Sequence, residues 1–183
     1  GFGLFGRVPK CLEAHYEIRP RFHRFSANLL GIERLTNMEY GLCLAGLCAR
    51  AAVNPKRLDT VEVRQGEHTE RFPLLAGALM NFPLGALPFQ PGVGVEDAEL
   101  SLHLVPFRSR LQALGLVACP QRNARAARRF QITRDTPVTL RVLNRDTMHF
   151  FLDEDPIEAR EVTLRVAGRL AFVPGKKFQP KNN

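Results

Sequence analysis

Short stretches in which apolar and polar residues alternate fill most of the chain after residue 58, and they constrain the fold more than any other feature. Such alternation places the apolar side chains on one face of a strand. Val61 and Val63 lie in one stretch, and the Gln65-Gly66-Glu67 turn after it predicts a hairpin. Residues 72–81 are nearly all apolar, which predicts a strand buried on both faces. Further strands are predicted at residues 99–105, 129–133, 138–142, 148–152, 162–166 and 170–173.

Two segments have helical spacing instead. Residues 38–52 follow a capping-box pattern, Thr36 to Glu39, and Asn54-Pro55 ends the apolar stripe. Residues 108–118 also predict a helix, and we expect the arginines after it to share one helical face. These arginines are Arg122, Arg125, Arg128 and Arg129.

The predicted fold class is therefore α+β, mostly an antiparallel β-sandwich with a few helices. Residues 1–174 are predicted to form one domain, and residues 175–183 a basic tail. Because the chain starts without Met, we expect it to be a piece of a longer protein. The first 20 residues have no clear pattern.

Composition narrows the class of protein. A hydrophobic content of 45% argues against a disordered chain, and no apolar run reaches the roughly 20 residues that span a bilayer. No secretory signal is present, so we expect a cytoplasmic location, with peripheral contact at the membrane. The net charge of +8 suits nucleic acid, nucleotide phosphates or anionic lipid without choosing among them. The four cysteines lack metal-ligand spacing and are expected to be buried free thiols.

Three carboxylates are crowded into the connection Asp153-Glu154-Asp155-Pro156, between two predicted strands. Asp and Pro are common turn residues for backbone reasons alone, so this segment reads first as a solvated turn. A carboxylate at the tip of a rigid hairpin also suits a general base, and neighbouring acids raise its pKa toward neutrality.

A second acidic segment, residues 94–99, leaves a glycine-rich loop and enters a strand. Loop carbonyls and a carboxylate are ligands that suit Mg²⁺, although strand-entry acids are also common on solvated surfaces. The arginine cluster at residues 19–24 and the one at 122–129 suit phosphate groups or a solvated face. The sequence contains no P-loop, GxGxxG or GxSxG motif, and His103 and His149 are expected to be ordinary strand side chains.

The two acidic segments, taken in order, resemble the diacylglycerol kinase-like lipid kinases, which include bacterial lipid kinases, sphingosine kinases and ceramide kinases. The resemblance covers residues 1–174 as the C-terminal domain of such a kinase. It is carried by "LLAGALMNFPLGALPFQPGVGVEDAELSLHLVPFRSRLQAL" and "FFLDEDPIEAREVTLRVAGRLAFVPG". In order along the chain, the matching residues are Asn81, Gly85, Pro91, Asp97, Leu100 and Ser109-Arg110. Two positions depart from the family pattern, since Asp153-Glu154-Asp155 replaces Asp-Gly-Glu and Ala98 replaces the glycine of Asp-Gly.

The resemblance implies roles for four residues. Asp155 matches the proton acceptor that activates the lipid hydroxyl, and Asp97 matches a metal-binding aspartate. Gly94 and Glu99 match its neighbours in a Mg²⁺ site. ATP would be the co-substrate, held mainly by a nucleotide-binding domain with a Gly-Gly-Asp-Gly-Thr motif, which is absent from this chain. This fragment alone is then expected to be inactive, and the two acidic segments to line one groove.

Two other hypotheses stay open. The departures from the family pattern and the basic tail favour a non-catalytic module that binds lipid or anionic membranes. A nucleic-acid-binding domain is supported by charge alone, and no nucleic-acid partner is expected because few aromatic residues are interleaved with the arginines.

Overall fold

The computed structural model describes residues 1–18, 36–80, 99–152 and 155–167. Its helices and strands are β1 Phe2–Gly3, α1 Leu4–Ile18, α3 Thr36–Val53, η1 Pro55–Arg57, β2 Asp59–Gln65, β3 His68–Met80, β4 Leu100–Pro106, α4 Arg110–Ala118, α5 Pro120–Arg125, β5 Arg128–Ile132, β6 Val138–Val142, β7 Met148–Leu152, β8 Asp155–Ala159 and β9 Glu161–Leu164. This mixture confirms the predicted α+β class.

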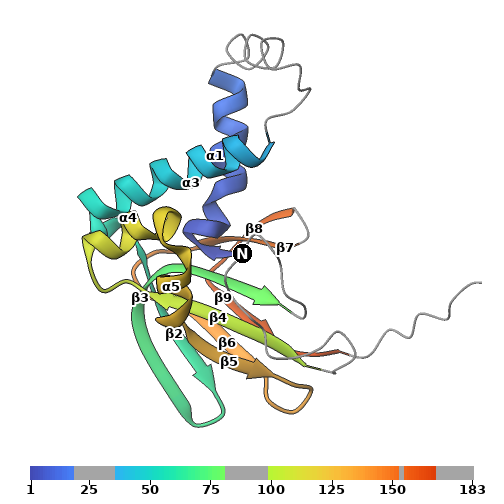
Figure 1. Ribbon diagram of the computed structural model, residues 1–183. Coiled ribbons are helices and arrows are strands. Elements are labelled where there is room, and N and C mark those ends of the chain that lie inside the picture. Colours follow the sequence, from blue (N-terminus) through green and yellow to red (C-terminus); the bar gives the residue numbers. More distant parts are fainter. Residues whose placement is uncertain (19–35, 81–98, 153–154, 168–183) are drawn as a thin grey trace, which may run out of the picture.

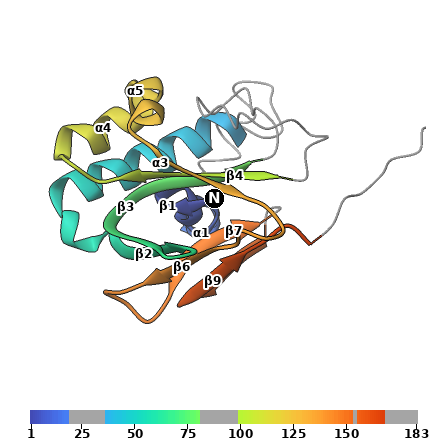
Figure 2. The same cartoon turned by 90° about the horizontal axis from the view of Figure 1, so that it is seen from below.

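The described strands form one nine-stranded sheet in which every pairing is antiparallel. The order is β8-β7-β1-β3-β2-β6-β9, and β4 branches from β3 and carries β5. The long strand β3 pairs with β2 through its first half and with β4 through its second, around a bulge at residues 74–76. The sheet therefore curves, and its two arms face each other as the layers of a sandwich do (Figure 2).

The space between the arms is the first of two cores. Leu102, Leu104, Leu140 and Phe150 pack there with other residues of the inner face. The second core lies on the outer face of β3 and β4, where Leu75, Val105 and Leu116 pack between the sheet and the helices. Helices α3, α4 and α5 cover this outer face, and α1 leads away from it (Figure 1, Figure 2). No helix in the described part of the chain is long and apolar enough to cross a membrane.

Local sequence explains several boundaries. Gly66 has a φ of 57°, which allows the tight turn between β2 and β3. Ser109 caps α4, because its Oγ accepts a hydrogen bond from the Gln112 backbone N–H at 3.1 Å. Pro120 begins α5, a position where the missing N–H costs nothing.

Most predicted elements are confirmed, including the helix at residues 38–52, the hairpin and the doubly buried strand β3. Three predictions were wrong. The arginines do not share one helical face, because α5 ends at Arg125 and the last two of the four lie in β5. Asp155 and Pro156, predicted to lie in the connection after residues 148–152, instead begin strand β8, which pairs with β7. Cys119 is exposed, although Cys43 and Cys48 are buried as expected. The strand predicted at 170–173 and the tail lie outside the described residues.

Candidate functional site

The strand register shows how the described ends of the two predicted acidic segments are placed relative to each other. Leu104 of β4, Gly77 of β3, Phe2 of β1, Phe150 of β7 and Ile157 of β8 lie opposite one another in one continuous row across five strands. Phe2 and Phe150 also stack, with ring centroids 5.7 Å apart. The short strand β1 therefore joins the β7–β8 hairpin firmly to the centre of the sheet.

Both β3 and β7 are antiparallel to β1, so they run in the same direction. Met80, at the end of β3, and Leu152, at the end of β7, consequently lie at the same end of the sheet. Ser101 pairs with Met80, and Asp155 pairs with Leu152. Glu99, just before β4, and the backbone of Asp155 thus share this end, which we call the acidic end. Four strand spacings separate them, about 19 Å along the sheet.

The structure gives the following positions for the predicted site residues. Asp155 is the first residue of β8, so the connection itself is residues 153–154, which with Gly94 and Asp97 lie outside the described residues. Glu99 is partly exposed, and its Oε2 accepts a hydrogen bond from Gln131 Nε2. The described residues contain no group of three or more His, Cys, Asp or Glu side chains that would hold a metal ion. The Mg²⁺ site therefore stays a prediction.

A buried polar cluster on the outer face of β4 follows Glu99 in the chain. Ser101 Oγ and His103 Nε2 are 2.9 Å apart, and Arg129 Nε donates to Ser101 Oγ at 3.2 Å. Burial, followed by the charge of Arg129, lowers the pKa of His103, so its imidazole stays neutral at neutral pH. Ser101 is fully buried. A substrate has no access to this hydroxyl, and the cluster therefore supports the start of β4 rather than acting as a nucleophile.

A second cluster fixes the β7–β8 hairpin to α1. Glu158 Oε1 lies 3.2 Å from Lys10 Nζ and 2.9 Å from His149 Nδ1. The hydrogen bond from Lys10, followed by the charge of His149, holds the pKa of Glu158 below its usual value. The Lys10–Glu158 contact joins the hairpin that begins at Asp155 to α1 at the surface.

Sequence reasoning did not find the Ser101–His103–Arg129 cluster. The sequence did contain a signal, because Ser101 and His103 are two residues apart on a strand. They therefore share a face, opposite to that of Leu102 and Leu104. Arg129 faces Ser101 and His103 only because β5 pairs with β4 in a register that no local pattern specifies.

No family model matches the sequence, and no curated protein matches it. Several solved structures are similar, and two of them are named as diacylglycerol kinases. One is a diacylglycerol kinase from Bacillus anthracis str. Sterne, with 9% identity and a TM-score of 0.42 over 66% of this chain. The other is a putative diacylglycerol kinase from the same strain, with 7% identity and a TM-score of 0.44 over 72% of this chain. The match covers 44% of each of those chains, less than half of their length.

Proposed function

We propose that this chain is the lipid-side domain of an ATP-dependent lipid kinase that phosphorylates a lipid hydroxyl such as that of diacylglycerol. The register supports the proposal, because Glu99 and the backbone of Asp155, far apart along the chain, lie at one end of the sheet. Both faces of β3 and β4 are buried, so a partner domain would approach these strands at their ends. A nucleotide-binding domain outside this chain would face it.

In this proposal Asp155 accepts the proton of the lipid hydroxyl. The hydroxyl oxygen then forms a bond to the γ-phosphorus of ATP while the bond between that phosphorus and the ADP oxygen breaks. A general base must come within hydrogen-bond reach of the proton it takes, which a residue at the start of a paired strand can do reproducibly. The β1 pairing and the Lys10–Glu158 contact support such fixed placement.

Glu99, with Asp97 and Gly94, would hold Mg²⁺ at the other side of the acidic end. A bound Mg²⁺ ion would neutralise charge on the ATP phosphates. Separate roles are proposed for Glu99 and Asp155, which lie four strand spacings apart along the sheet. Gln131 donates to one carboxylate oxygen of Glu99, and the other has no hydrogen-bond partner among the residues that the structure describes.

The test measures ATP-dependent phosphate transfer to diacylglycerol in mixed micelles, with the full-length gene product that includes this chain. Asp155→Asn should lower the rate by roughly 10²- to 10⁴-fold, the usual contribution of a general base. The matched control is Asp146→Asn, which changes an exposed aspartate between β6 and β7, beyond the opposite end of β7. An equal rate for the Asp155→Asn and wild-type proteins would refute the base assignment. No transfer by the wild-type protein would favour the non-catalytic lipid-binding alternative.

A further inference from the structure

The segment around α4 and α5 is strongly basic and has no acidic residue of its own. No Asp or Glu occurs between Glu99 and Asp135 in the sequence. Of the arginines in this interval, Arg128 pairs with Glu70 and Arg129 donates to Ser101. The other described ones near the two helices are exposed and form no ion pair within the described residues: Arg108, Arg110, Arg122 and Arg125. These positive charges are therefore available to an anionic partner.

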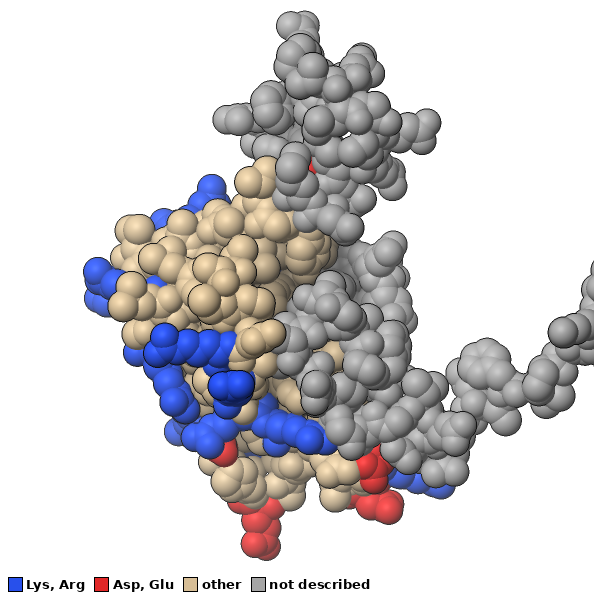
Figure 3. Space-filling model, in the orientation of Figure 1, with Lys and Arg blue, Asp and Glu red and all other residues tan. Residues whose placement is uncertain are grey.

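Helix α4 also exposes an apolar stripe. Leu111, Leu114 and Val117 are spaced three residues apart on α4, and 80%, 49% and 41% of their surfaces are exposed. Ala113 and Leu116, on the opposite side, are buried against the sheet. Figure 3 shows a broad surface without charged residues over the helical part of the molecule, with Lys and Arg side chains along its border. An apolar stripe edged by unpaired arginines has the composition of a surface that enters an anionic membrane interface.

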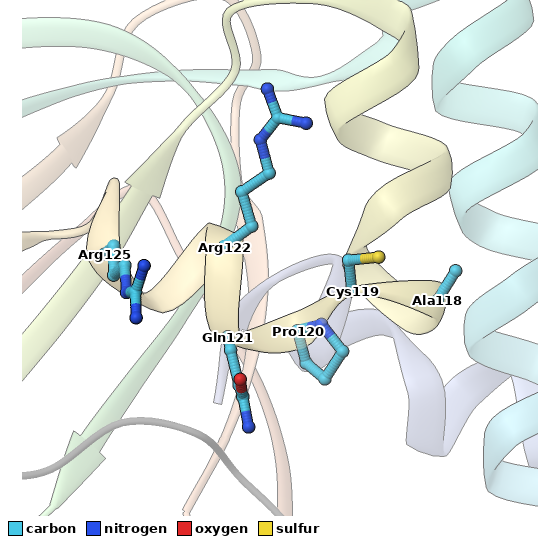
Figure 4. A pocket seen from close by; sticks show the side chains of 6 residues that line it. All are labelled: Ala118, Cys119, Pro120, Gln121, Arg122 and Arg125. Carbon is cyan, nitrogen blue, oxygen red and sulfur yellow. The ribbon is translucent and has the colours of Figure 1, made fainter.

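A pocket between α4 and α5 lies beside this stripe. Its volume is about 550 Å³, and its lining includes Arg108, Arg122, Gly115 and Asn123. A neighbouring hollow shares Cys119 and Arg122 and adds Arg125 (Figure 4). In Figure 4 the Arg122 side chain leaves the α5 ribbon on the same side as Cys119, and Gln121 points the other way.

Asn123, one of the residues that line the pocket, has an unpartnered polar atom. Only 3% of this residue is exposed, and its Oδ1 has no hydrogen-bond partner. A buried acceptor without a donor is costly, about 1–3 kcal/mol, and such groups need an explanation. A hydroxyl group entering between the two arginines would supply the missing donor, while the guanidinium groups bind a phosphate.

We propose that the α4–α5 surface docks on anionic membranes, with the pocket holding the phosphate of a phospholipid whose head group carries a hydroxyl. The chemistry matches phosphatidylglycerol, in which a phosphodiester and glycerol hydroxyls are adjacent. The exposed side chains of α4 then contact the acyl region. This inference stands on α4 and α5 alone and does not rest on the proposed kinase activity.

The test measures co-sedimentation of the 183-residue chain with vesicles, without ATP. Three compositions are compared: phosphatidylcholine alone, and phosphatidylcholine mixed with either phosphatidylglycerol or phosphatidylmethanol. The last two lipids have the same charge, but only phosphatidylglycerol has head-group hydroxyls. We expect salt-sensitive binding to both anionic mixtures, about fivefold tighter for phosphatidylglycerol, and none to phosphatidylcholine.

Substitutions on and away from this surface test whether it is the part of the chain that binds the vesicles. Arg122→Gln should weaken binding about fivefold, whereas Arg160→Gln, an equal charge change between β8 and β9, should not. Leu111→Ser should weaken it roughly tenfold, and Leu143→Ser is the matched control because Leu143 is exposed between β6 and β7. Asn123→Ala should remove the preference for phosphatidylglycerol.

Gly115→Gln closes the pocket without disturbing the fold. A Cβ built at Gly115 meets only Asn123 Nδ2, at 3.9 Å, so the new side chain extends into the pocket. We expect loss of head-group preference with unchanged thermal stability. Equal binding to neutral and anionic vesicles, equal losses for Arg122→Gln and Arg160→Gln, or a preference that survives Asn123→Ala would overturn the proposal. Self-association that Leu111→Ser abolishes would overturn it too, since a second copy would then cover the stripe.

Discussion

Helix α1 packs closely on β7 at Gly6, and this contact makes a sharp prediction for Gly6→Ala. A Cβ there would lie 2.3 Å from the His149 carbonyl oxygen and 2.8 Å from the Phe150 Cα. Both are backbone atoms, so no side-chain rotation relieves the overlap. Reaching the shortest ordinary contact, about 3.4 Å, requires a displacement of about 1 Å between α1 and β7. Such overpacking costs about 1–3 kcal/mol.

Alanine also recovers up to about 1 kcal/mol of helix propensity relative to glycine. We therefore expect Gly6→Ala to lower the free energy of unfolding by about 1–2 kcal/mol, or Tm by about 2–8 °C for a chain of this size. Gly46→Ala is the matched control, because Gly46 is exposed in α3 and a Cβ there meets nothing within 4 Å. That variant should be more stable than wild type by about 0.5–1 kcal/mol.

Urea denaturation followed by circular dichroism measures both variants against wild type. Three outcomes are informative. Opposite signs for the two glycines support the close packing of α1 on β7. A wild-type midpoint for Gly6→Ala would refute the reasoning, because it would mean that α1 stands farther from the hairpin. A loss of cooperativity confined to Gly6→Ala would show that, in the wild-type protein, α1 and the hairpin unfold as one unit through this contact.

Three further predictions concern stability. Leu104→Ala, in the inner core, should cost about 2–5 kcal/mol in urea denaturation, whereas Leu111→Ala, 80% exposed, should change stability by less than about 0.5 kcal/mol. Because the pKa of His103 is lowered in the fold, stability should fall as pH drops below about 6.5 toward that lower pKa; His103→Gln should flatten this slope, and an unchanged slope would contradict it. The hydrogen bond from Arg71 is the largest cause that holds the pKa of Glu62 below its usual value. The contribution of Glu62 to stability should therefore be present above about pH 4.5 and lost as pH falls through the folded pKa. Glu62→Gln should reduce that loss in acid titrations monitored by circular dichroism.

The alternating sequence predicted most strands because one face of each is buried. Residues 138–142 show this most clearly, with Val138, Leu140 and Val142 fully buried in the inner core. Two of the elements that were missed, α1 and β8, have sequences that locally oppose their structures. Pro9 lies inside α1, where proline is unfavourable, and Asp155-Pro156 begins a strand with two residues that favour turns. In both cases tertiary packing outweighs local preference.

The arginine-rich segment was misassigned for a different reason. Spacings of three and four residues between Arg122, Arg125 and Arg129 fit a helix, and the sequence Arg128-Arg129-Phe130-Gln131-Ile132 fits a strand equally well. Phe130 and Ile132 decide between them, because burying both in the inner core requires a period of two. A periodicity based on charged residues is weaker evidence than one based on apolar residues, since exposed charges have no packing partner that fixes their spacing.

The sequence proposes residue types for the candidate site but does not give their arrangement. The sequence alone singles out Glu99 and Asp155, yet their common end of the sheet depends on β1, a strand of only two residues. No sequence pattern identifies so short a strand, because two residues cannot establish an alternation. Without β1, the relative direction of β3 and β7 is undetermined, and so is the side on which the two acids lie.

The position of α4 limits what a lipid in its pocket can do. Helix α4 follows the carboxyl end of β4, whereas Glu99 precedes its amino end, and six residue steps of strand separate them, about 20 Å. A phosphate held by Arg108 and Arg122 is thus remote from the acidic end. A lipid in the α4–α5 pocket would therefore anchor the domain rather than react, and a substrate hydroxyl would have to reach the acidic end as a separate molecule.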